Sequence, residues 1–136
     1  MGPRQRLNIY LSELSDEPFK WGEHDCFTFT NGAFHAMYGF GYADDWIGRY
    51  MNDASPKNAT SMRREFKHST IFSGLASKLV KSERPIFGSL VTMNKYQRWV
   101  IGVSLGISLG SRAVFLSKDG LLKFNIEDVE SSWVPK

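Results

Sequence analysis

The residue best suited to nucleophilic chemistry is Cys26, the only cysteine in the chain. It follows Asp25 directly and begins an apolar pattern of helical spacing that runs to Tyr38. Asp25 is a favourable N-cap, because its carboxylate can accept hydrogen bonds from backbone N–H groups of the first turn. Cys26 would then occupy the first helical position, where unpaired N–H groups and the helix dipole stabilise a thiolate. The sequence therefore predicts a helix that presents a thiol at its N-terminus.

The helix that must position this thiol has a wide apolar arc. Gly32 inside it costs about 1 kcal/mol relative to alanine, which indicates that another element packs closely there. Gly39 follows as a C-terminal stop. We expect the helix to be central and largely buried. The apolar positions at helical spacing, with their aromatic flanks, are Cys26, Phe27, Phe29, Ala33, Phe34, Met37 and Tyr38.

A nucleophilic cysteine needs a base within hydrogen-bond reach, and the chain has three histidines. His24 precedes Cys26 on the approach loop and could flank the site. His35 would lie about 13 Å further along the helix, too far to serve the thiol. His68 belongs to a predicted helix junction far along the chain. The alternative is that Cys26 is a small buried apolar side chain without a chemical role.

Composition is that of an ordinary globular domain. A chain of 136 residues with 42% hydrophobic residues suits one domain, spanning residues 1–136. The net charge of +3 is scattered, so no nucleic-acid partner is expected, and the basic stretch around Arg63 and Arg64 is interpreted as a solvated face. One cysteine excludes a disulfide framework, and no metal or cofactor is expected. No apolar run is long enough for a transmembrane helix, and no signal peptide is apparent, so synthesis in the cytoplasm is expected.

Predicted helices come first along the chain and predicted strands follow. An amphipathic helix is expected over residues 3–14, with Leu7, Tyr10, Leu11 and Leu14 on one face. Strands are expected at residues 90–93, 98–105, 113–117 and 121–126, the last two joined by an Asp-Gly turn. This order predicts an α+β fold in which N-terminal helices pack on a C-terminal antiparallel sheet. A further helix capped by Ser69 or Thr70 is expected to carry the apolar stripe Ile71, Phe72, Leu75, Leu79 and Val80.

The segment before Cys26 resembles the cysteine motif of NlpC-type papain-like peptidases, in which a Trp-Gly-x-x-Asp-Cys run opens a buried helix. More closely, the chain is similar to a family of phage tail-associated proteins related to these peptidases. The resemblance covers nearly the whole chain and implies a papain-like (NlpC-type) fold for residues 1–136. The matching segments are Pro18-Phe19-Lys20-Trp21-Gly22-Glu23-His24-Asp25-Cys26, Gly48-Arg49-Tyr50, Gly88-Ser89-Leu90-Val91, Ile101-Gly102-Val103, Gly120-Leu121 and Trp133.

Two positions depart from the pattern of these peptidases. Their catalytic base is a histidine on the second strand, and the matching position here is Val100, whose aliphatic side chain cannot take a proton from a thiol. Ser89 stands where the family usually has aspartate after glycine. The resemblance therefore implies a peptidase-like domain that has lost its catalytic activity.

Two functions of different classes follow from the resemblance. The first is a structural component of a phage tail tip, associated with the hub, located in the virion and made in the host cytoplasm. The second is an active cysteine peptidase or amidase that cleaves peptidoglycan peptide bridges during infection or tail assembly. A host-side amidase-like domain is a third alternative. Tail-tip and hub proteins are the expected partners, with peptidoglycan as a further ligand. The expected binding residues are Trp21, His24, Asp25, Trp46 and Arg49.

Overall fold

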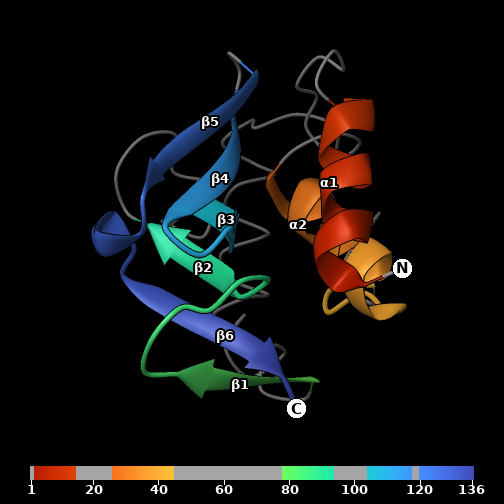
Figure 1. Ribbon diagram of the computed structural model, residues 1–136. Helices are drawn as coiled ribbons and strands as arrows, with labels where there is room; N and C mark the ends of the chain where they lie inside the picture. Colours follow the sequence, from red (N-terminus) through yellow and green to blue (C-terminus); the bar gives the residue numbers. More distant parts are fainter. Residues whose placement is uncertain (1, 15–25, 45–77, 94–103, 118–119) are drawn as a thin grey trace, which may run out of the picture.

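Two helices and a six-stranded antiparallel sheet make up the part of the chain that the structure describes, which confirms the α+β class. The computed structural model describes residues 2–14, 26–44, 78–93, 104–117 and 120–136, and only the backbone of Cys26 and Phe27. Both helices lie on the same side of the sheet (Figure 1). The elements are α1 (Pro3–Leu14), α2 (Cys26–Tyr38), β1 (Leu79–Ser82), β2 (Leu90–Met93), β3 (Ser104–Ser108), β4 (Arg112–Ser117), β5 (Gly120–Asn125), the 3₁₀ helix η1 (Ile126–Asp128) and β6 (Ser131–Pro135).

The strands are arranged in the order β1-β6-β2-β3-β4-β5, and each neighbouring pair is antiparallel. Strands β2 to β5 form a meander, whereas β6 returns across the sheet and pairs with both β1 and β2. Because strands have a right-handed twist, their directions rotate across the sheet. In Figure 1, β4 and β5 run steeply, while β1 and β6 lie across the view. Because β6 pairs with both β1 and β2, it attaches β1 to the meander.

The main core lies between the helices and one face of the sheet. Successive side chains of a strand point to opposite faces, so Leu90, Leu105 and Val114 face the helices while their neighbours face away. Helix α2 packs mainly on β3 and also on β4, and α1 packs on α2. The buried members of this core are Leu7, Phe29, Ala33, Phe34, Met37, Tyr42, Ala43, Leu79, Leu90, Leu105, Ile107, Val114, Leu116 and Trp133.

The other face of the sheet has a smaller apolar cluster, formed by Val91, Met93, Ala113 and Phe115. The connection from β5 to β6 crosses this face, and its partly buried Ile126 and Val129, with Phe124 of β5, pack on the cluster. Backbone hydrogen bonds fix the connection at both ends, from Ile126 N–H to the Ser111 carbonyl and from Glu130 N–H to the Thr92 carbonyl. Both faces of the central strands are therefore covered, which explains why β2 and β3 are buried at every position.

Helix α1 has the bounds expected from its sequence pattern. Leu7 is fully buried, while Tyr10, Leu11 and Leu14 are partly buried against the main core. The Arg6 guanidinium donates hydrogen bonds to the carbonyls of Ala36 (2.9 Å) and Met37 (2.7 Å). These carbonyls belong to the last turn of α2, where a cation is favoured by unpaired C=O groups and by the helix dipole. Arg6 therefore joins the two helices by capping one of them.

The prediction for Leu79 and Val80 is wrong, because these residues form strand β1 and not the end of an apolar-striped helix. Leu79 is buried and Val80 is 46% exposed, which is the alternation of a strand with one covered face. Strand β1 is held by backbone pairing with β6, which the sequence reading did not identify as a strand. Local apolar spacing could not reveal this pairing, because the two strands lie far apart in the chain.

The remaining strand predictions are confirmed where the structure describes them. Strand β2 has the predicted bounds, and β4 and β5 form the predicted hairpin, in which Ser117 pairs with Gly120. The described part of the third predicted strand is β3, which continues past Leu105 to Ser108. Residues 98–103 of that prediction lie outside the described residues, as do residues 69–77 of the predicted helix.

Candidate functional site

Helix α2 begins at Cys26 and ends at Tyr38, as expected from the sequence. Phe29, Ala33 and Met37 are buried, which confirms the predicted apolar arc among the described side chains. Gly39 follows with a φ of 82°, and its N–H donates to the His35 carbonyl (3.1 Å). A residue with positive φ at this place ends the helix and satisfies one of its free carbonyls, which favours glycine. Cys26 is the first residue of α2, so its backbone lies at the positive end of the helix dipole.

The C-terminal end of α2 is fixed beside the start of β2. The Tyr38 hydroxyl donates to the Gly88 carbonyl (3.0 Å), and Gly88 N–H donates to the carbonyl of Ser108 at the end of β3 (2.8 Å). Burial raises the pKa of Tyr38 above its ordinary value, so this hydroxyl stays protonated as a donor. Cys26 lies about 18 Å away along the helix axis. These contacts therefore fix the end of α2 that is opposite to Cys26.

The other predicted site residues lie outside the described residues. They are Trp21, His24, Asp25, Trp46 and Arg49. The side chain of Cys26 and the position Val100 also lie outside them. The structure thus describes the helix that begins at Cys26 and the loop after it as far as Asp44. The predicted N-cap role of Asp25 and the binding roles of the other residues stay predictions.

A polar network that the sequence reading did not anticipate lies along the exposed side of α2. Asn31 and His35 are one turn apart, so their side chains share a face of the helix. The Asn31 amide donates to Asp44 Oδ1 (2.8 Å), and His35 Nε2 lies 2.8 Å from the same oxygen. The His35 and Asp44 side chains are 50% and 45% exposed, whereas Asn31 is buried. One carboxylate oxygen thus joins two turns of the helix to the loop that follows it.

The loop after α2 folds back along the helix and is held there at several points. Ala43 N–H donates to Asn31 Oδ1 (2.8 Å), and the Tyr42 hydroxyl lies 2.7 Å from Thr30 Oγ1. Gly41 has no room for a side chain, because an added Cβ would lie 2.5 Å from Asn31 Oδ1 and 2.6 Å from His35 Nε2. The loop can therefore approach this closely only with glycine at position 41.

The Asp44 carboxyl has a pKa below its ordinary value of 3.8. Partial burial acts in the opposite direction and favours the neutral acid. It is outweighed by the hydrogen bonds from Asn31 and His35, by the positive charge that the His35 ring can carry, and by a backbone hydrogen bond from Gly41. The network thus favours an ionised Asp44.

The arrangement can orient an imidazole, but its distance from Cys26 argues against a role for His35 as the base for the thiol. His35 is the only histidine among the described residues, and it lies about 13 Å along the helix from Cys26. The network instead fixes the position of Asp44 beside α2. The sequence signal for it was a pair of polar residues one turn apart on an apolar helix, Asn31 and His35, followed closely by Asp44.

Within the described ranges, no three histidine, cysteine, aspartate or glutamate side chains gather closely enough to bind a metal ion. Within the same ranges, neither helix has the length and apolar character needed to cross a membrane.

The family described as "Domain of unknown function (DUF6950)" matches residues 2–134 of the chain. No curated protein and no solved structure gives a significant match.

Proposed function

We propose that this chain, which belongs to the DUF6950 family, is a structural component of a phage tail tip. In this proposal the chain is a single papain-like (NlpC-type) domain without catalytic activity. It is located in the virion and bound to tail-tip and hub proteins.

The observation that carries the proposal is the position of Cys26 at the first residue of a central helix. That helix packs on the middle strands of an antiparallel sheet that follows it in the chain. A cysteine at the start of a buried helix beside such a sheet is the arrangement implied by the resemblance to NlpC-type peptidases. A papain-like fold is therefore the reading that best accounts for both the motif and the architecture.

Loss of catalysis is inferred from the bases available to Cys26. The resemblance places the catalytic histidine at position 100, where this chain has valine. His35 lies about 13 Å from the helix start and is 2.8 Å from Asp44. Among the described residues Cys26 therefore has no base in reach, and a nucleophilic thiol needs one.

We infer a binding role from the network around Asp44 and from the residue types that follow it in the sequence. The network around Asp44 holds the chain immediately before the segment with Trp46 and Arg49. Aromatic and arginine side chains are the types that contribute most to protein interfaces. We therefore assign the contact with other tail proteins to this segment. Trp21, His24 and Asp25, which precede α2 in the sequence, are proposed as further binding residues. Peptidoglycan is proposed as a further ligand of the chain.

The direct test is to purify virions of a phage that encodes this chain and to identify their proteins by mass spectrometry. The proposal predicts peptides of this chain in intact virions, and in isolated tails after heads are removed. Detection only in the lysate of infected cells would contradict it.

An active cysteine peptidase or amidase is the second candidate, and the helix N-terminal position of Cys26 favours it. Incubation of the purified chain with peptidoglycan, followed by chromatography of the released peptides, separates the two candidates. The structural proposal predicts no release above that of Cys26→Ala. Release that disappears in Cys26→Ala would support the enzyme.

A further inference from the structure

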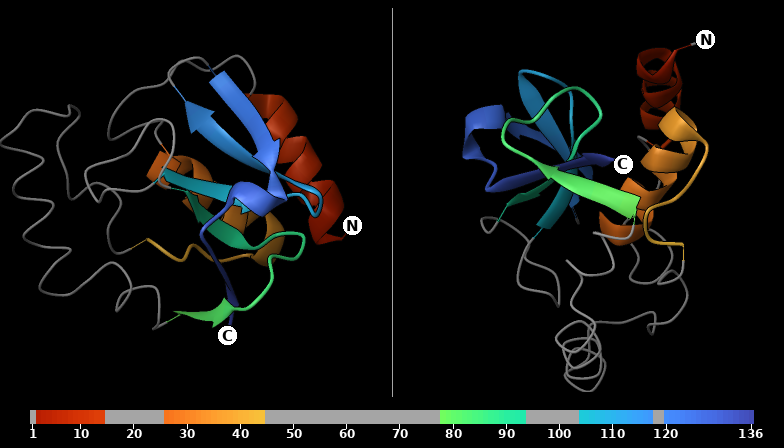
Figure 2. Two further views of the ribbon diagram at one scale, coloured as in Figure 1. Left: turned by 90° about the vertical axis from the view of Figure 1, so that its left-hand side faces the viewer. Right: turned by 90° about the horizontal axis from the view of Figure 1, so that it is seen from below.

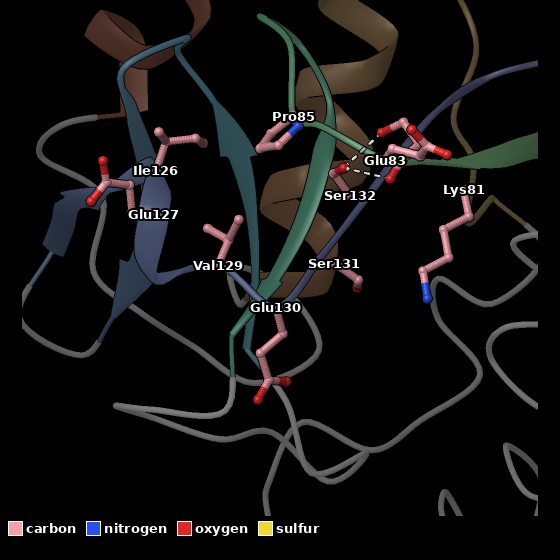
Figure 3. Close-up of a pocket in the computed structure, with 10 residues that line it drawn as sticks. Lys81, Glu83, Pro85, Ile126, Glu127, Val129, Glu130, Ser131 and Ser132 are labelled. Atoms are coloured by element: carbon pink, nitrogen blue, oxygen red, sulfur yellow. Dashed lines mark hydrogen bonds between the residues drawn. The ribbon is translucent and has the colours of Figure 1, made fainter.

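A pocket of about 370 Å³ opens on the side of the sheet away from the helices, between the end of β1 and the connection that leads into β6. Figure 3 shows Pro85 and Val129 between Glu127 on one side and Lys81 and Glu83 on the other. The right-hand view of Figure 2 shows η1 on the side of the sheet opposite to α1 and α2. The pocket is lined by Lys81, Ser82, Glu83, Pro85, Ile126, Glu127, Val129, Glu130, Ser131 and Ser132.

The apolar wall of the pocket consists of Pro85, Ile126 and Val129. Ile126 and Val129 also pack on the smaller apolar cluster of the sheet, so their positions are fixed by the fold. Ile86, the next residue after Pro85, is 60% exposed. The pocket therefore has a rigid apolar surface that could contact the aliphatic part of a ligand.

The hydroxyl groups of the pocket are already bonded within the protein. Ser82 Oγ lies 2.6 Å from Ser132 Oγ, and Ser132 Oγ also donates to the Ser82 carbonyl (3.2 Å). Ser131 Oγ lies 2.5 Å from Thr92 Oγ1. These hydroxyls join neighbouring strands, so the charged side chains are the groups left to bind a ligand.

The charge around the pocket is opposite to that of the whole chain. Glu83, Glu127 and Glu130 line the pocket together with a single cation, Lys81, whereas the chain has a net charge of +3. All four side chains are exposed, and none of them forms an ion pair with another residue in the described part of the chain. A cationic group that enters the pocket would therefore meet carboxylates that have no ion-pair partner among the described residues.

We propose that this pocket binds an arginine side chain from an extended segment of a partner protein. The aliphatic stem of arginine can lie on the Pro85 and Val129 wall while its head stays polar. Its planar guanidinium carries N–H donors in a fixed fork, which suits a carboxylate at the rim. This inference concerns a surface distant from Cys26, and it does not depend on whether the chain belongs to a phage tail.

The test is a titration of the isotope-labelled full chain, followed by NMR, with two blocked pentapeptides, Gly-Val-Arg-Val-Gly and Gly-Val-Glu-Val-Gly. We expect the arginine peptide to shift the backbone amides of Lys81, Glu83, Val129 and Ser132, with weaker binding at higher salt. The glutamate peptide should leave these signals in place. Equal binding of the two peptides, shifts confined to other surfaces, or no shift at millimolar peptide would each overturn the proposal.

Variants with opposite expected effects separate the site from a general loss of folding. Glu130→Gln should weaken binding of the arginine peptide about two- to fivefold, because it removes one exposed ion pair. Lys81→Gln should strengthen binding by a similar factor, because it removes the only cation at the rim. Glu13→Gln changes an exposed carboxylate of α1 and should leave the affinity unchanged. Equal affinities for all three variants would contradict the assignment.

Discussion

Cys26 and His35 lie on the same helix but near opposite ends of it. Cys26 is the first residue of α2, whereas His35 is near its end and 2.8 Å from Asp44. A helix rises about 1.5 Å per residue, so the two cannot form a nucleophile–base pair without unfolding α2. Cys26 and the His35 imidazole therefore lie on one helix without belonging to one site.

We predict that the Cys26 thiol reacts slowly for a cysteine at a helix N-terminus. A helix N-terminus favours a thiolate, whereas an apolar setting such as the buried Phe29 of the same helix turn opposes ionisation by desolvation. Alkylation rates with iodoacetamide measured across pH give the apparent pKa. A value below about 6 would contradict the prediction, since it would show a strongly stabilised thiolate.

Asp44 gives a pH dependence whose sign follows from its lowered pKa. A carboxyl group with a depressed pKa in the folded state stabilises the fold above its unfolded pKa, and this stability is lost as pH falls through the folded pKa. Asp44→Asn should therefore lower the free energy of unfolding near neutral pH. Because the side chain is 45% exposed, solvent screening limits the loss to about 1 kcal/mol or less.

Urea unfolding of the two proteins from neutral pH to about pH 2 measures this effect. The difference between them should shrink as the pH falls through the acidic range. The matched control is Glu13→Gln, which changes an exposed carboxylate of α1 with no such network. A difference between wild type and Asp44→Asn that stays constant over the whole range would contradict the prediction.

At the scale of elements, the contact between α1 and α2 depends on Gly32. An added Cβ would lie 3.0 Å from Tyr10 Cζ and still closer to the Tyr10 hydroxyl. That hydroxyl donates to the Phe29 carbonyl (2.8 Å), so the ring cannot move without losing a hydrogen bond. The inference from sequence that another element packs closely at Gly32 is thus confirmed.

Gly32→Ala should destabilise the protein by about 1–3 kcal/mol through overpacking, although alanine is the better helix former by about 1 kcal/mol. In a Tyr10→Phe background the clashing oxygen is absent, so the same change should cost less. A double-mutant cycle with urea unfolding should then give a coupling of at least about 0.5 kcal/mol. Strict additivity of the two changes would show that the contact is not the cause.

The elements that could be predicted from the sequence are those whose signals are local. Helix α1 has its stripe and α2 has its apolar arc and terminal glycine, while β4 and β5 have an Asp-Gly turn between them. Strands β1 and β6 could not be predicted, because each is short and stable only when paired with the other and with β2. Leu79 illustrates this, since its apolar spacing fits a helix equally well.

For the molecule as a whole, the sequence predicted where α2 begins but not which segments distant in the chain come together. The start of α2 at Cys26 followed from adjacent residues. The pocket combines Lys81 with Glu127, and the loop after α2 combines Gly41 with Lys78, whose Nζ donates to the Gly41 carbonyl (3.4 Å). Such contacts between distant segments depend on the topology of the sheet, which cannot be derived from residue spacing alone.

The proposed role makes a prediction for the segment after Asp44. If Trp46 is an interface anchor, Trp46→Ala should remove a contact of the kind that often contributes more than about 2 kcal/mol to binding. Phage that carry this change should then assemble fewer complete tails, as counted by electron microscopy. The isolated variant must first be shown to fold, by urea unfolding beside the wild-type chain. Normal tail numbers with a folded variant would exclude Trp46 as an anchor.

We propose that Cys26 serves the fold and takes part in no reaction, and the infectivity of phage without this thiol tests that proposal. Phage that carry Cys26→Ala are compared with wild-type phage for the infectivity of purified particles with assembled tails. We predict equal infectivity per particle, because the described residues supply no base for this thiol and the substitution leaves α2 able to form. Normally assembled tails that have lost infectivity would contradict the structural role and establish Cys26 as a catalytic nucleophile.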